Sequence, residues 1–330
     1  MRAIISGIGH FTPEGKMTNK DLEAMVDTSD EWIRTRTGIK ERRILEKGRG
    51  TSYMATRAAR AVLEQAHVSP DELDMIIVAT ITPDMLFPCT AALVQNELGA
   101  SNCWGFDLSA GCSGFVFGLA TACQFIETGR YRKIMVIGAD KMSSVMNYED
   151  RNTCILFGDG AGAVLLEPAQ DEEGLGVMDF SLHIDGSGAN ALCMPAGGSL
   201  LPATRETVDN KLHFLYQDGK TVFKNAVTTM SAISISLLDK NQLDQKDINV
   251  FIPHQANRRI IDAVAEKIGL DSDRVIVNID DYGNTTAATI PIAMSEASEQ
   301  RRIRKGDWVM ISAFGTGYTA GSLILKWAIE

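Results

Sequence analysis

The stretch Asp107-Leu-Ser-Ala-Gly-Cys-Ser-Gly114 places a cysteine between a β-branched and aromatic run and a long uncharged run of helical composition. This pattern predicts that Cys112 lies at a strand-to-helix junction. The first N–H groups of a helix have no partner inside it and favour an anion, so we expect a stabilised thiolate. The small neighbouring residues allow the close approach that a nucleophile on a tight turn requires. The alternative is a buried cysteine that acts only as a small apolar residue.

The two halves of the chain repeat one pattern around this cysteine. In the first half a strand-like run precedes Thr82, and Cys112 follows thirty residues later, directly after a glycine. In the second half a strand-like run precedes His254, and Asn284 follows thirty residues later, also directly after a glycine. The two runs are residues 75–80 and 248–253. The equal spacing predicts a duplicated α/β unit.

Both halves also continue in the same order. Each has a helical stretch, a basic turn, an apolar strand and a Phe-Gly-x-Gly motif; the matching pieces are 130–133 and 301–305, 134–137 and 308–311, 157–160 and 314–317. We therefore predict two related halves, residues 1–170 and 171–330, that share one sheet system. Because packed halves would bring equivalent helix starts to a shared centre, we expect Cys112, His254 and Asn284 to converge.

The composition is that of a globular protein with a large core: 330 residues, 45% hydrophobic and 22% charged. A net charge of −10 argues against broad nucleic-acid binding, which needs clustered Lys and Arg. No signal-peptide pattern opens the chain, and polar residues and glycines dilute the uncharged run 108–126, so we expect neither export nor a membrane span. The six cysteines show no CxxC pair and no metal spacing, which predicts reduced thiols in the cytoplasm and no metal site.

Two glycine-rich motifs look like nucleotide-binding loops but lack the required context. Residues 315–320 are followed by a strand-like run instead of the helix that a dinucleotide-binding fingerprint needs, and residues 158–162 fail in the same way. We therefore predict tight turns. Gly315 and Thr316, together with Cys112, are expected to supply the backbone N–H groups of an oxyanion hole. Glycines that merely turn the chain are the alternative, chiefly for the first motif.

His254 stands at another predicted strand-to-helix junction, since it follows Pro253 at the end of an apolar run. A helix N-terminus disfavours imidazolium, so we expect a neutral ring that can accept or donate through Nε2. For Asn284, helix N-capping is the alternative role, and asparagine is common at that position.

Four ordered motifs carry a resemblance to a known family: AGCSG at 110–114, PHQAN at 253–257, YGNT at 282–285 and FGTG at 314–317. In this order and spacing the chain resembles β-ketoacyl-acyl carrier protein synthase III, a thiolase-fold condensing enzyme, over essentially its whole length. The resemblance implies a thiolase-like five-layer α/β/α/β/α fold, a homodimer, and Cys112, His254 and Asn284 as a catalytic triad. Related enzymes for longer chains carry histidine in place of this asparagine, and thiolases carry a second late cysteine; neither pattern is present.

The implied reaction is a decarboxylative Claisen condensation that initiates fatty acid biosynthesis. Cys112 attacks an acyl-CoA primer, with acetyl-CoA the first expectation, and releases CoA. A malonyl thioester on acyl carrier protein then loses carbon dioxide, and His254 and Asn284 are expected to hydrogen-bond the enolate. The CoA thioesters are substrates, and no metal or redox cofactor is implied.

The resemblance also implies binding residues. Trp32 and Arg151 are expected to sandwich the adenine of CoA, with Arg36 or Thr37 at its polar end. Packing of Trp32 on an amphipathic helix is the alternative. Asn257 is a further expected CoA contact. The carrier protein is expected at Gln255, Ala256, Asn257, Arg258, Arg259, Lys224 and Lys267, where a solvated charged face is the alternative for the cations.

Two residues beside the predicted oxyanion turn depart from the family pattern. Thr316 stands where the family usually has another glycine, and Ala320 where a tryptophan is common. Both leave the triad intact but alter the expected acyl pocket, so branched and longer primers stay open beside acetyl. Phe87 is expected to line that pocket from the neighbouring subunit.

Three other functions compete with this assignment. A secondary-metabolism relative would use the same triad to transfer the acyl group to another acceptor. A hydroxymethylglutaryl-CoA synthase type would need a glutamate base near the nucleophile, and none lies between Glu97 and Glu127. A non-catalytic thiolase-fold scaffold would have lost at least one member of the triad.

Overall fold

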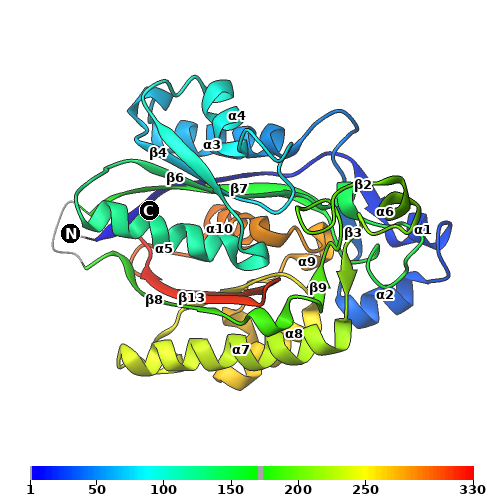
Figure 1. Cartoon of the computed structure of the whole chain (residues 1–330). Helices are drawn as coiled ribbons and strands as arrows, with labels where there is room; N and C mark the ends of the chain where they lie inside the picture. The colour runs from blue at the N-terminus through cyan, green and yellow to red at the C-terminus, as the bar shows by residue number, and fades with distance from the viewer. Residues whose placement is uncertain (1, 170–173) are drawn as a thin grey trace.

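Two mixed β-sheets and three layers of helices make up the chain, described by a computed structural model over residues 2–169 and 174–330. Helices cover the outer face of each sheet, and two more lie between the sheets (Figure 1). From top to bottom of the view these are α3 Thr51–Ala66 and α4 Thr90–Leu98, then α5 Gly114–Glu127 and α10 Thr289–Glu299, then α7 Gly219–Lys240 and α8 Arg258–Ile268. The predicted five-layer α/β/α/β/α arrangement is confirmed.

The strand order is the same in both sheets. The first runs β1 Ala3–Phe11, β7 Asp159–Pro168, β6 Ile134–Lys141, β4 Met75–Ala79, β5 Trp104–Leu108. The second runs β8 Gly176–Ile184, β13 Thr319–Lys326, β12 Trp308–Gly315, β11 Val250–Pro253. In each, the third strand is antiparallel to the second and parallel to the fourth. Where the first sheet has β5, the second has one parallel bridge between Phe251 and Val275.

This correspondence explains the repeated sequence pattern, because equivalent strands and helices follow each other in both halves. The predicted boundary between residues 170 and 171 lies outside the described residues, and the division into domains 1–170 and 171–330 stays a prediction.

Smaller elements decorate the ends of the sheets. They are β2 Lys16–Thr18, α1 Asn19–Glu23, α2 Asp30–Thr37, β3 Glu41–Arg43, β9 Leu192–Cys193, α6 Arg205–Asp209, β10 Tyr216–Gln217 and α9 Ile279–Tyr282. Short 3-10 turns are η1 Pro70–Glu72, η2 Gly111–Ser113, η3 Met142–Val145, η4 Gly186–Gly188, η5 Gln245–Asp247, η6 Ser272–Arg274 and η7 Thr286–Ala288. Of these, η2 leads into α5 and η7 into α10, the two helices of the middle layer.

The middle layer explains the long uncharged run near Cys112. Helix α5 packs against strands of both sheets, and Phe115, Leu119 and Ile126 are fully buried on it. A charge there would have to leave water without a partner. Within residues 2–169 and 174–330, no helix has the length and apolarity needed to cross a membrane.

Candidate active site

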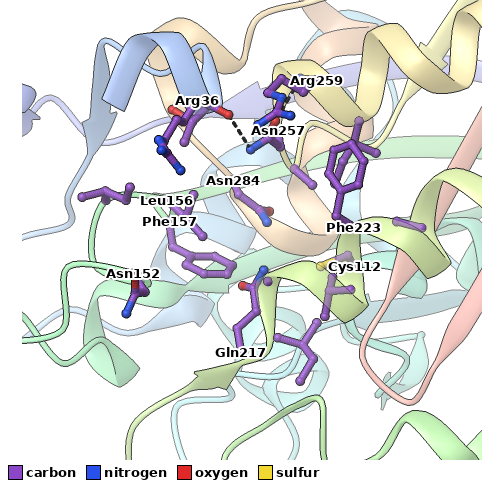
Figure 2. Close-up of a pocket in the computed structure, with 18 of the residues that line it drawn as sticks. Arg36, Cys112, Asn152, Leu156, Phe157, Gln217, Phe223, Asn257, Arg259 and Asn284 are labelled. Carbon is purple, nitrogen blue, oxygen red and sulfur yellow. Dashed lines mark hydrogen bonds between the residues drawn. The ribbon is translucent and has the colours of Figure 1, made fainter. Parts of the chain in front are cut away.

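A cavity of about 670 Å³ brings the three predicted residues together: Cys112, His254 and Asn284 all line it. Figure 2 shows Cys112 and Asn284 at the same hollow, although they come from opposite halves of the chain. This volume lies in the range of pockets that hold small organic ligands. The predicted convergence is therefore observed, whereas the catalytic roles of the three residues are not tested by it.

Cys112 lies in η2, directly before α5, as its place in the sequence predicted. The pKa of its thiol, however, is not lowered by this position. Burial and then the nearby charge of Asp140 raise the pKa of Cys112 to about 12. The thiol is therefore protonated at neutral pH, and nucleophilic attack by Cys112 would require a base.

The last residue of β12, Gly315, lies against the backbone of Cys112. A Cβ atom on Gly315 would lie 2.6 Å from the Cys112 nitrogen, so only glycine fits at this position. Two hydrogen bonds fasten the contact: Thr319 Oγ1 donates to Ala110 O at 2.8 Å, and Ser113 Oγ donates to Thr319 O at 3.1 Å. The last two strands of the second sheet thereby hold the loop that carries the thiol.

Thr316, in this turn, uses its hydroxyl elsewhere, since Oγ1 donates to the carbonyl of Leu192. Within the described chain, neither Gly315 nor Thr316 lines the cavity. An oxyanion hole formed by their N–H groups with that of Cys112 stays a prediction.

His254 follows β11 and is buried, with its backbone N–H donating to Ser312 O at 2.8 Å. Its ring Nδ1 lies 2.7 Å from Thr289 Oγ1. Burial lowers the pKa of His254 to about 3. The neutral imidazole that the sequence predicted is supported, although the cause is burial and not the helix N-terminus.

Asn284 lines the cavity and also holds the backbone of the turn that follows it. Its side-chain Oδ1 accepts a hydrogen bond from Thr286 N at 2.8 Å, at the first residue of η7, whose N-cap residue is Thr285. Its backbone N–H donates to Leu156 O at 2.8 Å and fixes the residue against the first half. Because the Thr286 N–H identifies the oxygen of the carboxamide, the NH₂ group is the part free to face the cavity.

Asp140 is a buried residue behind the cavity that sequence reasoning missed. One carboxylate oxygen accepts from Thr80 Oγ1, the Ile81 N–H, and the N–H and hydroxyl of Thr82. The other accepts from Thr286 Oγ1 and the Ala287 N–H. Burial raises the pKa of Asp140, and these donors oppose the rise. Its carboxylate joins the ends of β4 and β6 to η7; the available signal was an acid ending the apolar strand 134–139.

Lowering the pH is expected to destabilise the fold through His254. Its pKa of about 3 in the folded state lies below the value of 6.5 for an unperturbed histidine, so between these values the unfolded chain binds a proton that the folded chain does not. The free energy of unfolding should fall by up to about 1.4 kcal/mol per pH unit from this residue. Denaturant unfolding at pH 7, 6 and 5 measures the slope, which should be shallower in His254→Gln. An unchanged slope in His254→Gln would contradict the argument, and exposed His183→Gln is the control.

Trp32, on α2, lines the cavity, and two arginine side chains lie over its ring. The Arg36 guanidinium lies 4.8 Å and that of Arg151 4.6 Å from its ring centroid. Thr37 lines the cavity as well, whereas Arg151 does not. An adenine between Trp32 and Arg151 would have to replace their present contact, so the predicted sandwich stays a prediction.

The predicted carrier-protein residues separate into three groups. Gln255 is 1% exposed, and its amide bonds Pro253 O, Ile276 O and Asn278 N. Its prediction as a carrier-protein contact is wrong, because the side chain holds β11 to the following loop and offers no surface. Ala256, Asn257 and Arg259 line the cavity. Lys224, Arg258 and Lys267 are exposed outside it.

Asn257 has both ends of its amide in use. Nδ2 donates to Arg36 O at 3.0 Å, and Oδ1 accepts from the Arg259 N–H at 2.9 Å (Figure 2). It thus caps α8 and ties that helix to α2.

Phe87 lies away from the cavity within the single chain. It is 84% exposed, beside Leu86, which is 81% exposed. Its place in an acyl pocket needs a second subunit and stays a prediction.

Apolar residues of α7 form one wall of the cavity that was not predicted. Val222, Ala226 and Met230 follow each other at one-turn spacing, with Phe223 beside them. The spacing is visible in the sequence, but it is equally typical of a helix that packs on a core.

Comparison with known proteins assigns the chain to a family. Residues 106–186 match the family described as 3-Oxoacyl-[acyl-carrier-protein (ACP)] synthase III, and residues 238–327 match its C-terminal family. The beta-ketoacyl-[acyl-carrier-protein] synthase III of Chlorobaculum tepidum is 55% identical over 329 residues, which cover 99% of this chain and 100% of the relative. The chain belongs to the synthase III family. The resemblance inferred from the four motifs is confirmed.

Solved structures of synthase III proteins share the fold. The enzyme from Aquifex aeolicus has 42% identity and a TM-score of 0.91, with 98% of this chain and 100% of that chain covered. A priming beta-ketosynthase from the R1128 polyketide pathway has 33% identity and a TM-score of 0.90, covering 99% of this chain and 96% of that one. These matches confirm the thiolase-like fold of this synthase III family member. Among residues 2–169 and 174–330, no group of three His, Cys, Asp or Glu side chains is arranged to hold a metal ion.

Proposed function

We propose that the protein is an acyltransferase that condenses an acyl-CoA primer, acetyl-CoA first, with malonyl-acyl carrier protein and so begins fatty acid biosynthesis. The observation that carries this proposal is the single cavity in which a buried thiol meets a neutral imidazole and a carboxamide from the other half of the chain. Family membership and the names of the full-length relatives support it.

The first stage moves the acyl group to Cys112. The thiol gives its proton to His254, the sulfur attacks the thioester carbon, and the bond from that carbon to the CoA sulfur breaks. The proton then passes to the departing CoA sulfur, so the products are an acyl-cysteine and free CoA. A base is needed because burial keeps the thiol protonated at neutral pH.

The second stage forms the carbon–carbon bond. Loss of carbon dioxide from the malonyl thioester leaves an enolate, whose oxygen accepts a hydrogen bond from Asn284 Nδ2. The carbanion attacks the acyl-cysteine carbonyl, and the bond to Cys112 sulfur breaks. One proton taken up from solvent returns the thiolate to a thiol, and the β-ketoacyl thioester leaves. The substrates are an acyl-CoA and a malonyl thioester of the carrier protein, and the proposed reaction uses no further cofactor.

The edge of the cavity near Trp32 is the proposed entry for CoA. Trp32→Ala is expected to raise KM for the acyl-CoA about tenfold with kcat little changed, because an adenine would lose an aromatic face beside two guanidinium groups. Steady-state kinetics with varied acetyl-CoA measure this. Trp308→Ala is the matched control, since Trp308 is also half-buried beneath a cation, Lys326 at 5.0 Å, but lies outside the cavity. An equal effect of both substitutions would contradict a CoA role for Trp32.

A carrier protein is proposed to dock on exposed cations of α7 and α8, of which Arg259 lines the cavity: Lys224, Arg258, Arg259 and Lys267. On a chain of net charge −10 such a local group favours an acidic partner. Arg258 shares its charge with Asp262 through a 2.8 Å ion pair, so Arg259 and the two lysines are the stronger candidates.

A homodimer is proposed through the free edge of the first sheet. Strand β5 is the last strand of that sheet within the described chain, and Trp104 on it is 44% exposed. In the single chain, Leu86 and Phe87 are two further apolar side chains that are exposed to solvent. Such edges and patches are usually covered by a partner. A cytoplasmic location is proposed because all six cysteines are free thiols.

The proposed function is tested by supplying acetyl-CoA with malonyl-carrier protein and identifying the product by mass spectrometry. A β-ketobutyryl carrier protein and free CoA are the expected products. Transfer of the acyl group only to an oxygen or nitrogen acceptor would favour a secondary-metabolism enzyme instead. The structural match to a polyketide priming enzyme is the reason to test this alternative.

A further inference from the structure

The side-chain amide of Gln217 is a polar group of the cavity that the proposed mechanism does not use. Gln217 lies on β10 and lines the cavity. Within residues 2–169 and 174–330, its amide has no hydrogen-bond partner. The other side-chain amides of the cavity, those of Asn152, Asn257 and Asn284, each bond a protein group. Gln217 is therefore available to contact a bound molecule.

Strand β10 is held to the loop of the thiol by a series of contacts. Gln217 pairs with Leu192 of β9, and the carbonyl of Leu192 accepts a hydrogen bond from Thr316 Oγ1. Thr316 in turn packs on the residue before the cysteine, because a Cβ atom on Gly111 would lie 2.5 Å from Thr316 Cγ2. The β9–β10 pair, with Gln217 on it, is thereby fixed against the loop that carries Cys112.

Gln217 lies on the side of the cavity that an acyl group would occupy. Figure 2 shows Arg36 and Gln217 at opposite ends of the view, with Cys112 between them. The Arg36 guanidinium lies over Trp32, where CoA is proposed to enter. An acyl group transferred to the Cys112 sulfur from that entry extends towards the opposite end, where Gln217 lies.

The wall around Gln217 is otherwise apolar. Its partner across the pair, Leu192, belongs to a buried apolar cluster. Members of the same cluster that line the cavity include Val222, Ala226, Met230, Ile260 and Phe314. A long acyl chain would fit these side chains, but it would also remove water from the Gln217 amide and offer no hydrogen bond in return. Burial of an amide without a partner weakens binding by about tenfold or more.

We infer that Gln217 is a specificity-determining residue that favours short acyl primers and rejects long apolar ones. The inference rests on the proposed function, since it concerns the primer of the same site. Beside an acetyl group the amide of Gln217 stays in contact with water, whereas beside a hexanoyl group it is buried without a partner. The selection acts on formation of the acyl-cysteine, before the malonyl thioester binds.

Gln217→Met is expected to raise the rate of acylation by hexanoyl-CoA about tenfold relative to that by acetyl-CoA. Methionine is an unbranched side chain of similar length, but it has no group that requires a hydrogen bond. Intact mass spectrometry follows acyl-cysteine formation with each primer in the unaltered protein and in the variant. The ratio of the two rates within one protein is the readout, because a loss of stability would lower both rates together.

Two further variants are the controls. Gln217→Glu keeps the shape and polarity of the side chain and should keep the preference for acetyl-CoA. Gln124→Met makes the same replacement at an exposed position of α5, outside the cavity, where the amide donates to Glu127 Oε2 at 2.9 Å. It should leave the ratio unchanged. An unchanged ratio in Gln217→Met, or an equal change in Gln124→Met, would overturn the inference.

The outcomes separate this inference from the proposed function. An acyl-cysteine that forms with the expected ratios but does not condense with malonyl-carrier protein would overturn the proposed condensation and support the role of Gln217. Condensation that proceeds with acetyl-CoA and hexanoyl-CoA at the same ratio in the unaltered protein and in Gln217→Met would support the proposed function and overturn the role of Gln217.

Discussion

Cys112→Ala is expected to abolish the acyl-enzyme. After incubation with acetyl-CoA, the intact mass of the unaltered protein should rise by one acetyl group, and that of Cys112→Ala should not change. Turnover should fall by at least about 10³-fold, because removal of a nucleophile from a catalytic set costs as much as or more than this. The cavity contains no other cysteine within the described residues, so no second thiol is placed to take over.

The matched control for this experiment is Cys123→Ala. Cys123 is also fully buried in the middle layer, on α5, but it lies in the core and not at the cavity. Its removal should leave acylation intact at some cost in stability. Persistent acylation of Cys112→Ala would mean that another residue is the nucleophile, and the mechanism proposed for the first stage would be wrong. The same masses, collected over a panel of acyl-CoAs, would rank the primers.

Asn284→Asp is expected to lower the decarboxylation rate by about 10²–10³-fold, the effect of losing one donor to a developing oxyanion. The substitution keeps the shape of the side chain and an oxygen for the Thr286 N–H, but replaces the NH₂ group with a charge that repels the enolate. Release of carbon dioxide from malonyl-carrier protein is the measurement. Acylation of Cys112 should survive, because Asn284 is proposed to act in the second stage.

Asn210→Asp is the control for this prediction. Its Nδ2 donates to Glu206 O at 2.9 Å on the exposed end of α6, outside the cavity, and its change should leave both stages unaltered. Decarboxylation at the original rate in Asn284→Asp would rule out donation from this side chain. Loss of both stages together would instead indicate a collapsed loop at η7.

The convergence of Cys112, His254 and Asn284 was predictable because the thirty-residue spacing repeated in the two halves corresponds to the same succession of strands and helices. Thr82 and His254 follow the equivalent strands β4 and β11, and Cys112 and Asn284 precede the equivalent helices α5 and α10. Equal separations along the chain therefore become equivalent places in space. The glycine at 315 was recognisable for the same reason, since both halves carry the motif where an equivalent strand is about to begin or has just begun, β13 and β7 respectively. The repeated spacing and the glycine motif each lie within a short stretch of chain, so a single sequence is enough to recognise them.

The interior contacts were not predictable, since they join residues far apart in the chain. Asp140 and Thr286 are separated by 146 positions, and neither has a neighbour that points to the other. The prediction of a stabilised Cys112 thiolate was wrong for a related reason. The helix start was visible in the sequence, but the burial and the nearby carboxylate, which together raise the pKa of the thiol, were not. Gln255 was misplaced because its position beside His254 says nothing of the carbonyl groups that surround its amide.

The fastening of the Ala110–Ser113 loop to Thr319 ties the cysteine of the first half to a strand of the second half. Its two hydrogen bonds join residues 209 and 206 positions apart, and Gly315 lies against the backbone of Cys112 beside them. The position of the thiol therefore depends on the folding of both halves, and a side chain introduced at Gly315 should disturb Cys112 as directly as a change within its own loop.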